Sequence, residues 1–442
     1  MEPGRWMVFA GLVLLLTGMF FGVVGALQYA IPGALKNVLS FEKTRPLHVS
    51  SVVLWILFTA TGSVVTYLHH YQRGRAKFGF LSLSQLVFFL VAAVLILSSY
   101  LLGYFGGREY WEFPPPIALL LLAGWVFFIL QVGSLIKTLR RQPVYIWMWV
   151  TGALGFLFTF SESYLWLFDY FGADIVRDMT VQWKSYGAMV GCWNMLVYGA
   201  GIFLMEKISG DKQYAHSIMA FSLFFLGLVN LMFNWSHHIY TLPVGATLRH
   251  VGYVVSMTEL FILGRIIYKW RDLVTASQKS EHHLPYRFLM IADFWVFLNL
   301  ILAILISIPG VNIFTHGTHI TVAHAMGTTI GINTMILLAV TFDLFDNQCH
   351  LFNTSGIKRA TKLVNGSLFV FIGSLVAAGI QRGKWQMDHA VASFGQMMRE
   401  LAPWFMIFCA AGILLFIGFL FIIVPLLKSI VVCTFYSDRP PR

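Results

Sequence analysis

The sequence predicts an all-α protein of twelve transmembrane helices, and three observations support this fold class. Of its 442 residues, 58% are hydrophobic and only 11% are charged, whereas a soluble domain carries roughly 25% charged residues. Apolar runs recur along the whole chain at a length of about 20 residues, which spans a bilayer core. The basic residues behind the net charge of +11 lie in short loops between these runs, which indicates a membrane surface rather than nucleic acid.

The apolar runs define the predicted bundle. They cover residues 6–31, 46–68, 79–104, 115–137, 144–168, 181–205, 215–236, 248–270, 286–309, 318–343, 361–380 and 402–428. No linker or soluble domain interrupts them, so we expect residues 1–442 to form a single transmembrane domain.

The charge of the loops predicts the orientation. Lysine and arginine concentrate in the loops that begin near His69, Lys137, Glu206, Lys269 and Ile357, and in the C-terminal tail. Basic loops face the cytoplasm, so both termini are expected there, in a multi-pass protein of the cell inner membrane. The alternate loops are richer in glycine, proline, histidine and aromatics, and we expect the site near that periplasmic side.

Four histidines lie just inside the outer ends of predicted helices. His48 opens the second span, His237 and His238 end the seventh, and His324 lies early in the tenth. One such histidine alone would be typical of an interfacial side chain bonded to a carbonyl. Four at one depth on three helices instead indicate ligands, because membrane-depth ionisable groups mark function and neutral imidazole binds heme iron and borderline metals.

These histidines belong to longer motifs. The first span carries GALQY (Gly25–Tyr29), RxxH ends at His48, and the pair His237–His238 precedes Glu259 on the next span. The stretch THGTHITVAH leads into the tenth span and ends at His324. Together the motifs resemble those of the catalytic subunit of cytochrome c-dependent nitric oxide reductases, in the heme–copper oxidase superfamily, with this chain as a divergent member.

The resemblance implies a ligand set and a fold like subunit I of heme–copper oxidases. His48 takes the place of a low-spin heme ligand, and His324 that of the proximal ligand of a high-spin heme. His237 and His238 take the places of two ligands of a non-heme metal, with Glu259 beside it. The twelve spans and their orientation agree with that family.

Met326 is the first departure from the family pattern. The family has a second histidine two residues after the position of His324, one ligand for each heme, and here that residue is Met326. Methionine is a competent axial ligand, so a low-spin heme between His48 and Met326 is expected. A packing role for Met326 stays open, since the chain has 18 methionines.

The sixth span is the second departure, because the third histidine of the non-heme metal is missing there. Asp178, Gln182 and Tyr186 are four residues apart and share one helical face. One register aligns Tyr186 with the missing histidine and another aligns Gln182 with it. Asp178 could instead supply a carboxylate ligand or simply end the helix in water. Oxygen ligands favour iron over copper.

The resemblance implies reduction of nitric oxide to nitrous oxide, with two hemes, expected to be b-type, and one non-heme metal. Glu259 would tune the metal and deliver protons, and Tyr186 is a candidate proton donor. The electron donor is expected to be a cytochrome c or a partner subunit, with quinol as the alternative.

Three other functions stay open. An O2 reductase with a modified metal site is favoured by Tyr186, because oxygen reductases of the superfamily carry a tyrosine on this helix. Dismutation of nitric oxide is another possibility. A transporter is a third, although neither internal repeats nor broken helices are visible in the sequence.

Overall fold

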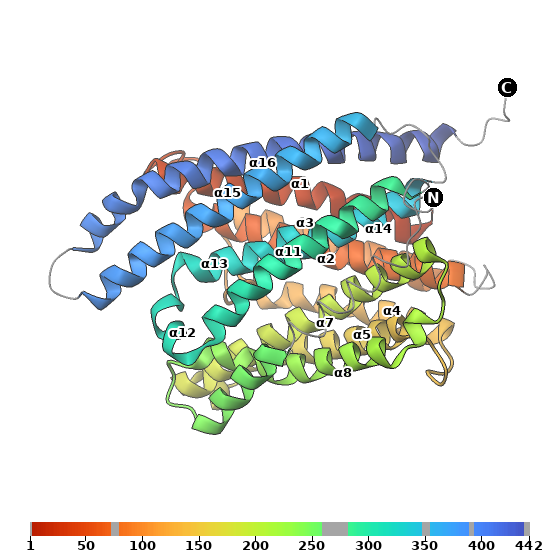
Figure 1. The fold of residues 1–442 in the computed structure, drawn as a ribbon, viewed down its shortest axis with the longest axis horizontal. Helices are drawn as coiled ribbons and strands as arrows, with labels where there is room; N and C mark the ends of the chain where they lie inside the picture. The colour runs from red at the N-terminus through yellow and green to blue at the C-terminus, as the bar shows by residue number, and fades with distance from the viewer. Residues whose placement is uncertain (1, 72–78, 259–281, 347–353, 389–392, 437–442) are drawn as a thin grey trace.

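The computed structural model describes residues 2–71, 79–258, 282–346, 354–388 and 393–436. The described chain is a bundle of long helices whose axes run roughly along one direction (Figure 1). Eleven of its helical segments are long and apolar enough to cross a membrane. Within these residues the only β pairing is an isolated bridge between Arg108 and Trp111.

The eleven segments contain the following helices: α1 (Pro3–Ala30), α2 (Phe41–Tyr71), α3 (Phe80–Leu102), α4 (Ala118–Leu135), α5 (Val144–Glu162), α7 (Ile175–Ser209), α8 (Ile218–Phe233), α11 (His283–Ser307), α13 (His319–Met326) with α14 (Met335–Asp346), α15 (Thr354–Met387) and α16 (Phe394–Tyr436). Short elements connect them: η1 (Pro115–Ile117), η2 (Leu165–Leu167), α6 (Asp169–Gly172), η3 (Tyr214–His216), η4 (Asn234–Ile239) and α12 (Pro309–Thr315).

The all-α membrane fold is confirmed, and eleven of the twelve predicted spans correspond to these segments. The remaining predicted span covers 248–270. Residues 246–258 are helical, and the rest of that span lies outside the described residues.

Glycines determine how closely the first two helices pack. Gly4, Gly11 and Gly18 recur every seven residues on α1, which keeps them on one face. A Cβ added at these positions would lie 2.5, 2.2 and 2.8 Å from side-chain atoms of Thr66, Thr59 and Val52 on α2. The backbone of α1 therefore lies directly against side chains of α2 at these three positions.

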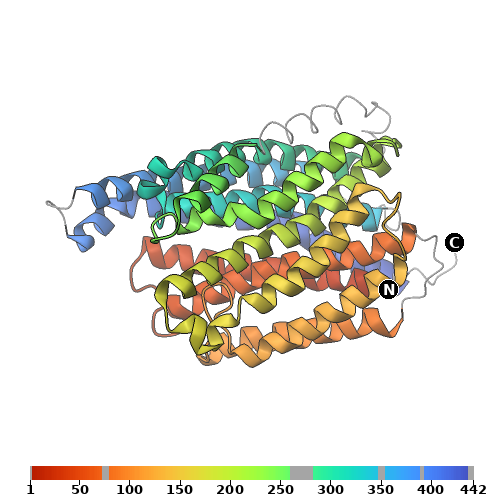
Figure 2. The same ribbon diagram turned by 90° about the horizontal axis from the view of Figure 1, so that it is seen from below.

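The helices alternate in direction, which places the motif residues at one end of the bundle. α1 begins and α16 ends at the same end, and α12 and the start of α13 lie at the other (Figure 1). The start of α2, the start of α7 and η4 share that second end. Figure 2 shows α1–α5 on one side of the bundle and α8, α11 and α13 on the other. The geometry agrees with one common face for the site, whereas its periplasmic assignment stays a prediction.

The tenth span is interrupted by a π-helical segment, η5 (Gly327–Thr334), between α13 and α14. Two glycines let α11 lie against it: a Cβ on Gly327 would meet Asn299 Oδ1 at 2.3 Å, and one on Gly331 would meet Trp295 Cγ at 2.6 Å. The Asn299 amide bonds the Thr328 hydroxyl at 2.7 Å. π-Helical turns are rare and occur frequently at functional sites.

α15 and α16 project past the rest of the bundle at the end that carries the motifs (Figure 1). α16 has 43 residues, which makes it roughly 65 Å long at about 1.5 Å per residue. The two helices are held together near their far end by a small apolar cluster of Ala378, Met397, Leu401 and Phe405.

Candidate functional site

His237 and His238 lie side by side in η4, the 3-10 turn that ends the seventh span. Their ring centroids are 4.2 Å apart, and the side chain of His237 is buried. The Asn312 amide of α12 donates to the His237 carbonyl at 3.2 Å. The pair therefore consists of one buried and one half-buried imidazole, and its position is fixed from a second segment of the chain.

Trp183 of α7 fixes the second imidazole. Its ring stacks on His238 with centroids 5.0 Å apart and planes 10° apart. η4 reaches α7 because residue 187 is glycine: a Cβ there would lie 2.6 Å from Trp235 Cβ. Two residues of α7 thus position the histidine pair: Gly187 lets η4 approach closely, and Trp183 stacks on His238.

His324 lies on α13, and His316 lies in the turn before it. Both interact electrostatically with the His238 ring. The structure therefore brings two of the predicted ligands, His237 and His238, into contact and places His324 within electrostatic range of His238. It adds His316, which belongs to the same THGTHITVAH motif as His324.

His48 is held by α1. Its Nδ1 lies 2.7 Å from the Gly18 carbonyl and so donates a hydrogen bond to it. The Nδ1–Cε1 edge of its ring lies against Gly22, where a Cβ would meet Nδ1 at 2.8 Å. Metal-ligating histidines characteristically donate one ring N–H to a carbonyl and present the other nitrogen to the metal. The orientation of His48 is compatible with this pattern, and its role as a heme ligand stays a prediction.

Met326 ends α13 directly before the π-helical segment and packs, partly buried, against the hydrophobic core. His324 and Met326 are two residues apart, so their side chains leave the helix in roughly opposite directions, about 200° apart. This placement is compatible with ligands to two different hemes, and the axial role of Met326 stays a prediction.

Asp178 and Gln182 share one face of α7, as predicted, and both contact Arg108 from the loop before η1. Arg108 forms an ion pair with Asp178, and its Nη1 lies 3.4 Å from Gln182 Oε1. The guanidinium also lies over the ring of Trp166, 4.8 Å from its centroid. The structure thus gives both residues a cationic partner, and their role as metal ligands stays a prediction.

Tyr186 is buried one turn further along α7, and its ring meets Tyr110 edge to face at 5.7 Å. Glu259 lies outside the described residues, so its predicted position beside the histidine pair stays a prediction. In the part of the chain that the structure describes, no group of three histidine, cysteine or carboxylate side chains is arranged to hold a metal ion.

The side chains present nevertheless suit the hemes and the non-heme metal that the sequence implies. His48 is oriented by a carbonyl and His237 and His238 supply two adjacent nitrogen donors, with His324 near them. Imidazoles of this kind bind heme iron and non-heme iron or copper. The chemistry of the donor set therefore fits hemes and one further metal.

Sequence reasoning missed the residues that hold the ligands. Trp183, Gly22 and Arg108 belong to no motif, and each acts on a residue far from it in sequence. The partner of Glu162 was missed as well: this carboxylate at the end of α5 stands out in the sequence as an intramembrane group, and the structure pairs it with Lys184 of α7.

Comparison with known proteins identifies the family. The family described as Cytochrome C and Quinol oxidase polypeptide I matches residues 2–427. The chain is 22% identical to a nitric oxide reductase subunit of Stutzerimonas stutzeri, over 98% of this chain and 93% of that protein. It is 25% identical to a cytochrome c oxidase subunit 1 homolog of Agrobacterium tumefaciens (strain T37), over 93% of this chain and 79% of that protein.

A solved structure has the same fold. A heme-copper terminal oxidase dimer determined by cryo-EM superposes with a TM-score of 0.76 at 13% sequence identity, covering the whole of this chain and 85% of that one. Its helical arrangement agrees with the bundle described above. The protein is a member of the cytochrome c and quinol oxidase polypeptide I family, the heme–copper oxidase subunit I family of membrane oxidoreductases.

Proposed function

We propose that this member of the family reduces nitric oxide: two NO, two electrons and two protons give nitrous oxide and water. The observation that carries the proposal is the contact pair of His237 and His238, whose second ring stacks on Trp183, followed in sequence by a carboxylate, Glu259, on the next predicted span. In the motif resemblance this carboxylate distinguishes the nitric oxide reductases from the oxygen reductases.

The curated relatives include proteins of both candidate classes. The chain spans 93% of the nitric oxide reductase subunit that it matches. It spans 79% of the cytochrome c oxidase subunit 1 homolog, and 80% of cytochrome c oxidase subunit 1 of Rhodobacter capsulatus, to which it is 24% identical.

Each ligand has a proposed role. His48 and Met326 hold a low-spin heme, His324 holds a high-spin heme, and His237, His238 and Glu259 hold a non-heme iron. When bound, these groups supply electron transfer and the binding of both substrate molecules. The protein's own part is to hold them in register: the Gly18 carbonyl fixes the His48 ring, and Trp183 fixes that of His238.

Iron is favoured over copper because a carboxylate ligand suits the harder ion. Glu259 is the proposed ligand of this type. Asp178 is the other candidate, but its pairing with Arg108 reduces its availability. Glu259 also serves as the proposed donor of protons to the site, with Tyr186 as a further donor.

The proposed electron donor is a cytochrome c or a cytochrome c-like partner subunit, with quinol as the alternative. The proposed setting is the cell inner membrane, with the histidine end of the bundle toward the periplasm and both termini in the cytoplasm. Such a donor would dock at the end of the bundle that carries the histidines (Figure 1).

O2 reduction is the second candidate function, and the buried Tyr186 on α7 favours it, together with the likeness to cytochrome c oxidase subunits. Oxygen reductases use a tyrosine on this helix as a proton and electron donor.

One experiment separates these functions. Purified protein is supplied with an artificial reductant, and NO and O2 consumption are measured at electrodes while headspace N2O is quantified. We expect one N2O for every two NO consumed and slower O2 consumption. Faster O2 than NO consumption would assign an oxidase, O2 released from NO would assign a dismutase, and protein without heme absorbance would exclude all three and leave the transporter.

A further inference from the structure

A cavity of about 640 Å³ lies at the opposite end of the bundle from the histidines, between the starts of α11 and α15. Both helices begin at the end where α1 begins (Figure 1). None of its lining residues in the described part of the chain is acidic, and three are basic or can be protonated: His283, Arg287 and Lys362. Nothing in the proposed reaction uses this cavity.

The lining residues of α11 follow one helical face. The residues on this face either adjoin or are spaced by three or four positions: His283, Arg287, Met290, Ile291 and Phe294. The first two lie at the membrane end of the helix and the last three lie deeper. The wall of the cavity therefore changes from cationic to apolar with depth.

Two donor atoms at the basic end of the cavity have no hydrogen-bond acceptor in the part of the chain that the structure describes. Among the described residues, His283 Nδ1 and Arg287 Nε are buried and find no hydrogen-bond partner. Lys358 of α15 and Arg287 both repel a positive charge on His283. Buried donors without acceptors cost free energy, and gathered like charges add to that cost. An anion with several acceptor oxygens would remove both penalties.

We propose that this cavity binds an anionic phospholipid, with the phosphate between His283, Arg287 and Lys362 and an acyl chain along Met290, Ile291 and Phe294. The polarity of the wall matches that of a lipid: charge at the membrane surface and hydrocarbon below it. Basic pockets between transmembrane helices on the cytoplasmic side are a known form of lipid site, and this end of the bundle is the predicted cytoplasmic end.

A quinol would fit the cavity's amphipathic wall less well. Its ring is uncharged, and it would lie at the far end of the bundle from the histidines that carry the proposed redox centre (Figure 1). The gathered positive charge selects an anionic head group instead.

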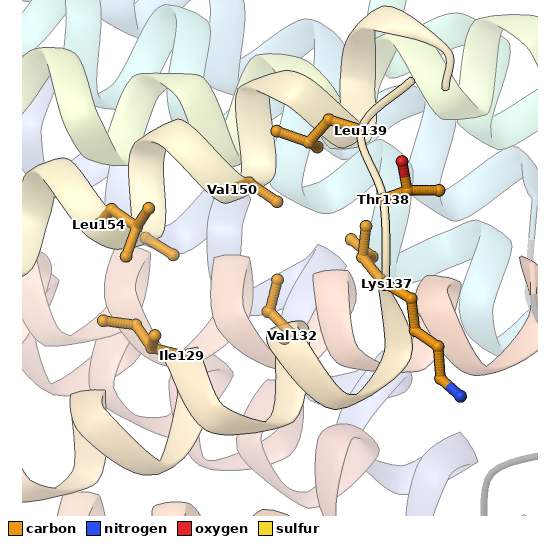
Figure 3. Close-up of a pocket in the computed structure, with 10 residues that line it drawn as sticks. Ile129, Val132, Lys137, Thr138, Leu139, Val150 and Leu154 are labelled. Carbon is orange, nitrogen blue, oxygen red and sulfur yellow. The ribbon is translucent and has the colours of Figure 1, made fainter. Parts of the chain in front are cut away.

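A second cavity provides an internal comparison. It has a volume of about 280 Å³ and lies between α4 and α5, with apolar lining residues that include Ile129, Val132, Val150 and Leu154. Lys137, the one basic residue among its described lining residues, directs its ammonium group away from these side chains (Figure 3). This cavity can accept a neutral chain but offers no site for a phosphate.

The test uses the full-length protein in detergent, with Arg287→Gln/Lys362→Gln as the variant and Lys137→Gln as the matched control. Binding of dioleoyl phosphatidylglycerol is measured by native mass spectrometry and by the rise in melting temperature, beside dioleoyl phosphatidylcholine and inorganic phosphate. Each basic side chain near an anionic lipid contributes about a factor of five. We expect the double variant to bind phosphatidylglycerol roughly thirtyfold more weakly and Lys137→Gln to bind it as the wild type does.

Three results would overturn the proposal. One is equal binding of phosphatidylglycerol by the wild type and the double variant. Another is equal binding of phosphatidylcholine, which would mean that charge is not recognised. A third is stabilisation by inorganic phosphate alone, which would assign a free-anion site. If the double variant does not fold, the conservative Arg287→Lys variant should retain binding and Lys362→Gln alone should weaken it about fivefold.

Discussion

Trp183 lies flat against His238, with ring centroids 5.0 Å apart and planes 10° apart. An imidazole beside an aromatic face loses rotational freedom, so it presents the same nitrogen to a ligand each time. The ring of His237 lies 4.2 Å from that of His238, so packing against a fixed ring restricts its rotation as well. The contact links α7 to η4 and gives the histidine pair a fixed shape.

The first prediction concerns this stacking. Trp183→Leu should lower the affinity for the non-heme metal about tenfold, because residues that orient a ligand typically contribute 10- to 100-fold. Trp183→Phe keeps a flat ring and should retain most of the metal. Metal content per protein after dialysis measures the effect. Trp193→Leu on the same helix is the control, and equal metal loss in both leucine variants would contradict the assignment.

The second prediction concerns the ring of His48. Gly22→Ala should displace it, because the new Cβ would lie 2.8 Å from Nδ1 and 2.9 Å from Cε1. Gly25→Ala is a matched control on the same helix, where the nearest atom is 3.6 Å away. Heme per protein should fall toward half in Gly22→Ala and stay unchanged in Gly25→Ala. Unchanged heme content and reduced spectrum in both variants would argue against His48 as a heme ligand.

The third prediction separates two roles for Asp178. If its main role is the ion pair with Arg108, Asp178→Asn and Arg108→Gln should each lower the free energy of unfolding by about 1–3 kcal/mol and the double variant by much less than the sum. We expect this coupling, with metal content unchanged. Metal loss in Asp178→Asn alone, with Arg108→Gln normal, would instead assign Asp178 as a ligand.

The fourth prediction is a pH dependence in the loop before η1. Burial raises the pKa of Glu112 above its ordinary value, although Arg45 pairs with it at 2.6 Å. A carboxyl whose pKa is raised by folding binds its proton more tightly in the folded protein, so its charged form destabilises the fold at neutral pH. That cost disappears as the pH falls through the folded pKa.

Glu112→Gln should therefore raise the melting temperature at pH 7, and its advantage over the wild type should shrink toward pH 4. Glu109→Gln is the control, since Glu109 pairs with the same arginine at 2.7 Å but has a side chain that is 41% exposed. The melting temperature of Glu109→Gln should differ little from that of the wild type at either pH. Destabilisation by Glu112→Gln at pH 7 would mean that the ion pair with Arg45 outweighs burial.

The sequence predicts the parts of this protein that depend on local patterns. Spans follow from runs of apolar residues, and the histidines stand out because His48, His237 and His324 lie near the same ends of those spans. The shared face of Asp178 and Gln182 follows from helical spacing alone. Their contact with Arg108 does not, because it joins residues 70 and 74 positions apart.

Other features depend on tertiary contacts that no local pattern encodes. The π-helical segment after Met326 lies where Asn299 and Trp295 of another helix pack closely against Gly327 and Gly331. Helical periodicity alone predicts a continuous α-helix there. The position of Glu259, which carries the choice between nitric oxide and oxygen in the resemblance, lies outside the described residues.

The seam of Gly4, Gly11 and Gly18 has a mechanical consequence. Because a Cβ at any of the three positions would lie within 2.8 Å of an α2 side chain, the two helices pack with little space between them. His48 of α2 also donates to the Gly18 carbonyl of α1. Its imidazole is therefore tied to both helices, and we expect a displacement of either helix to alter its position.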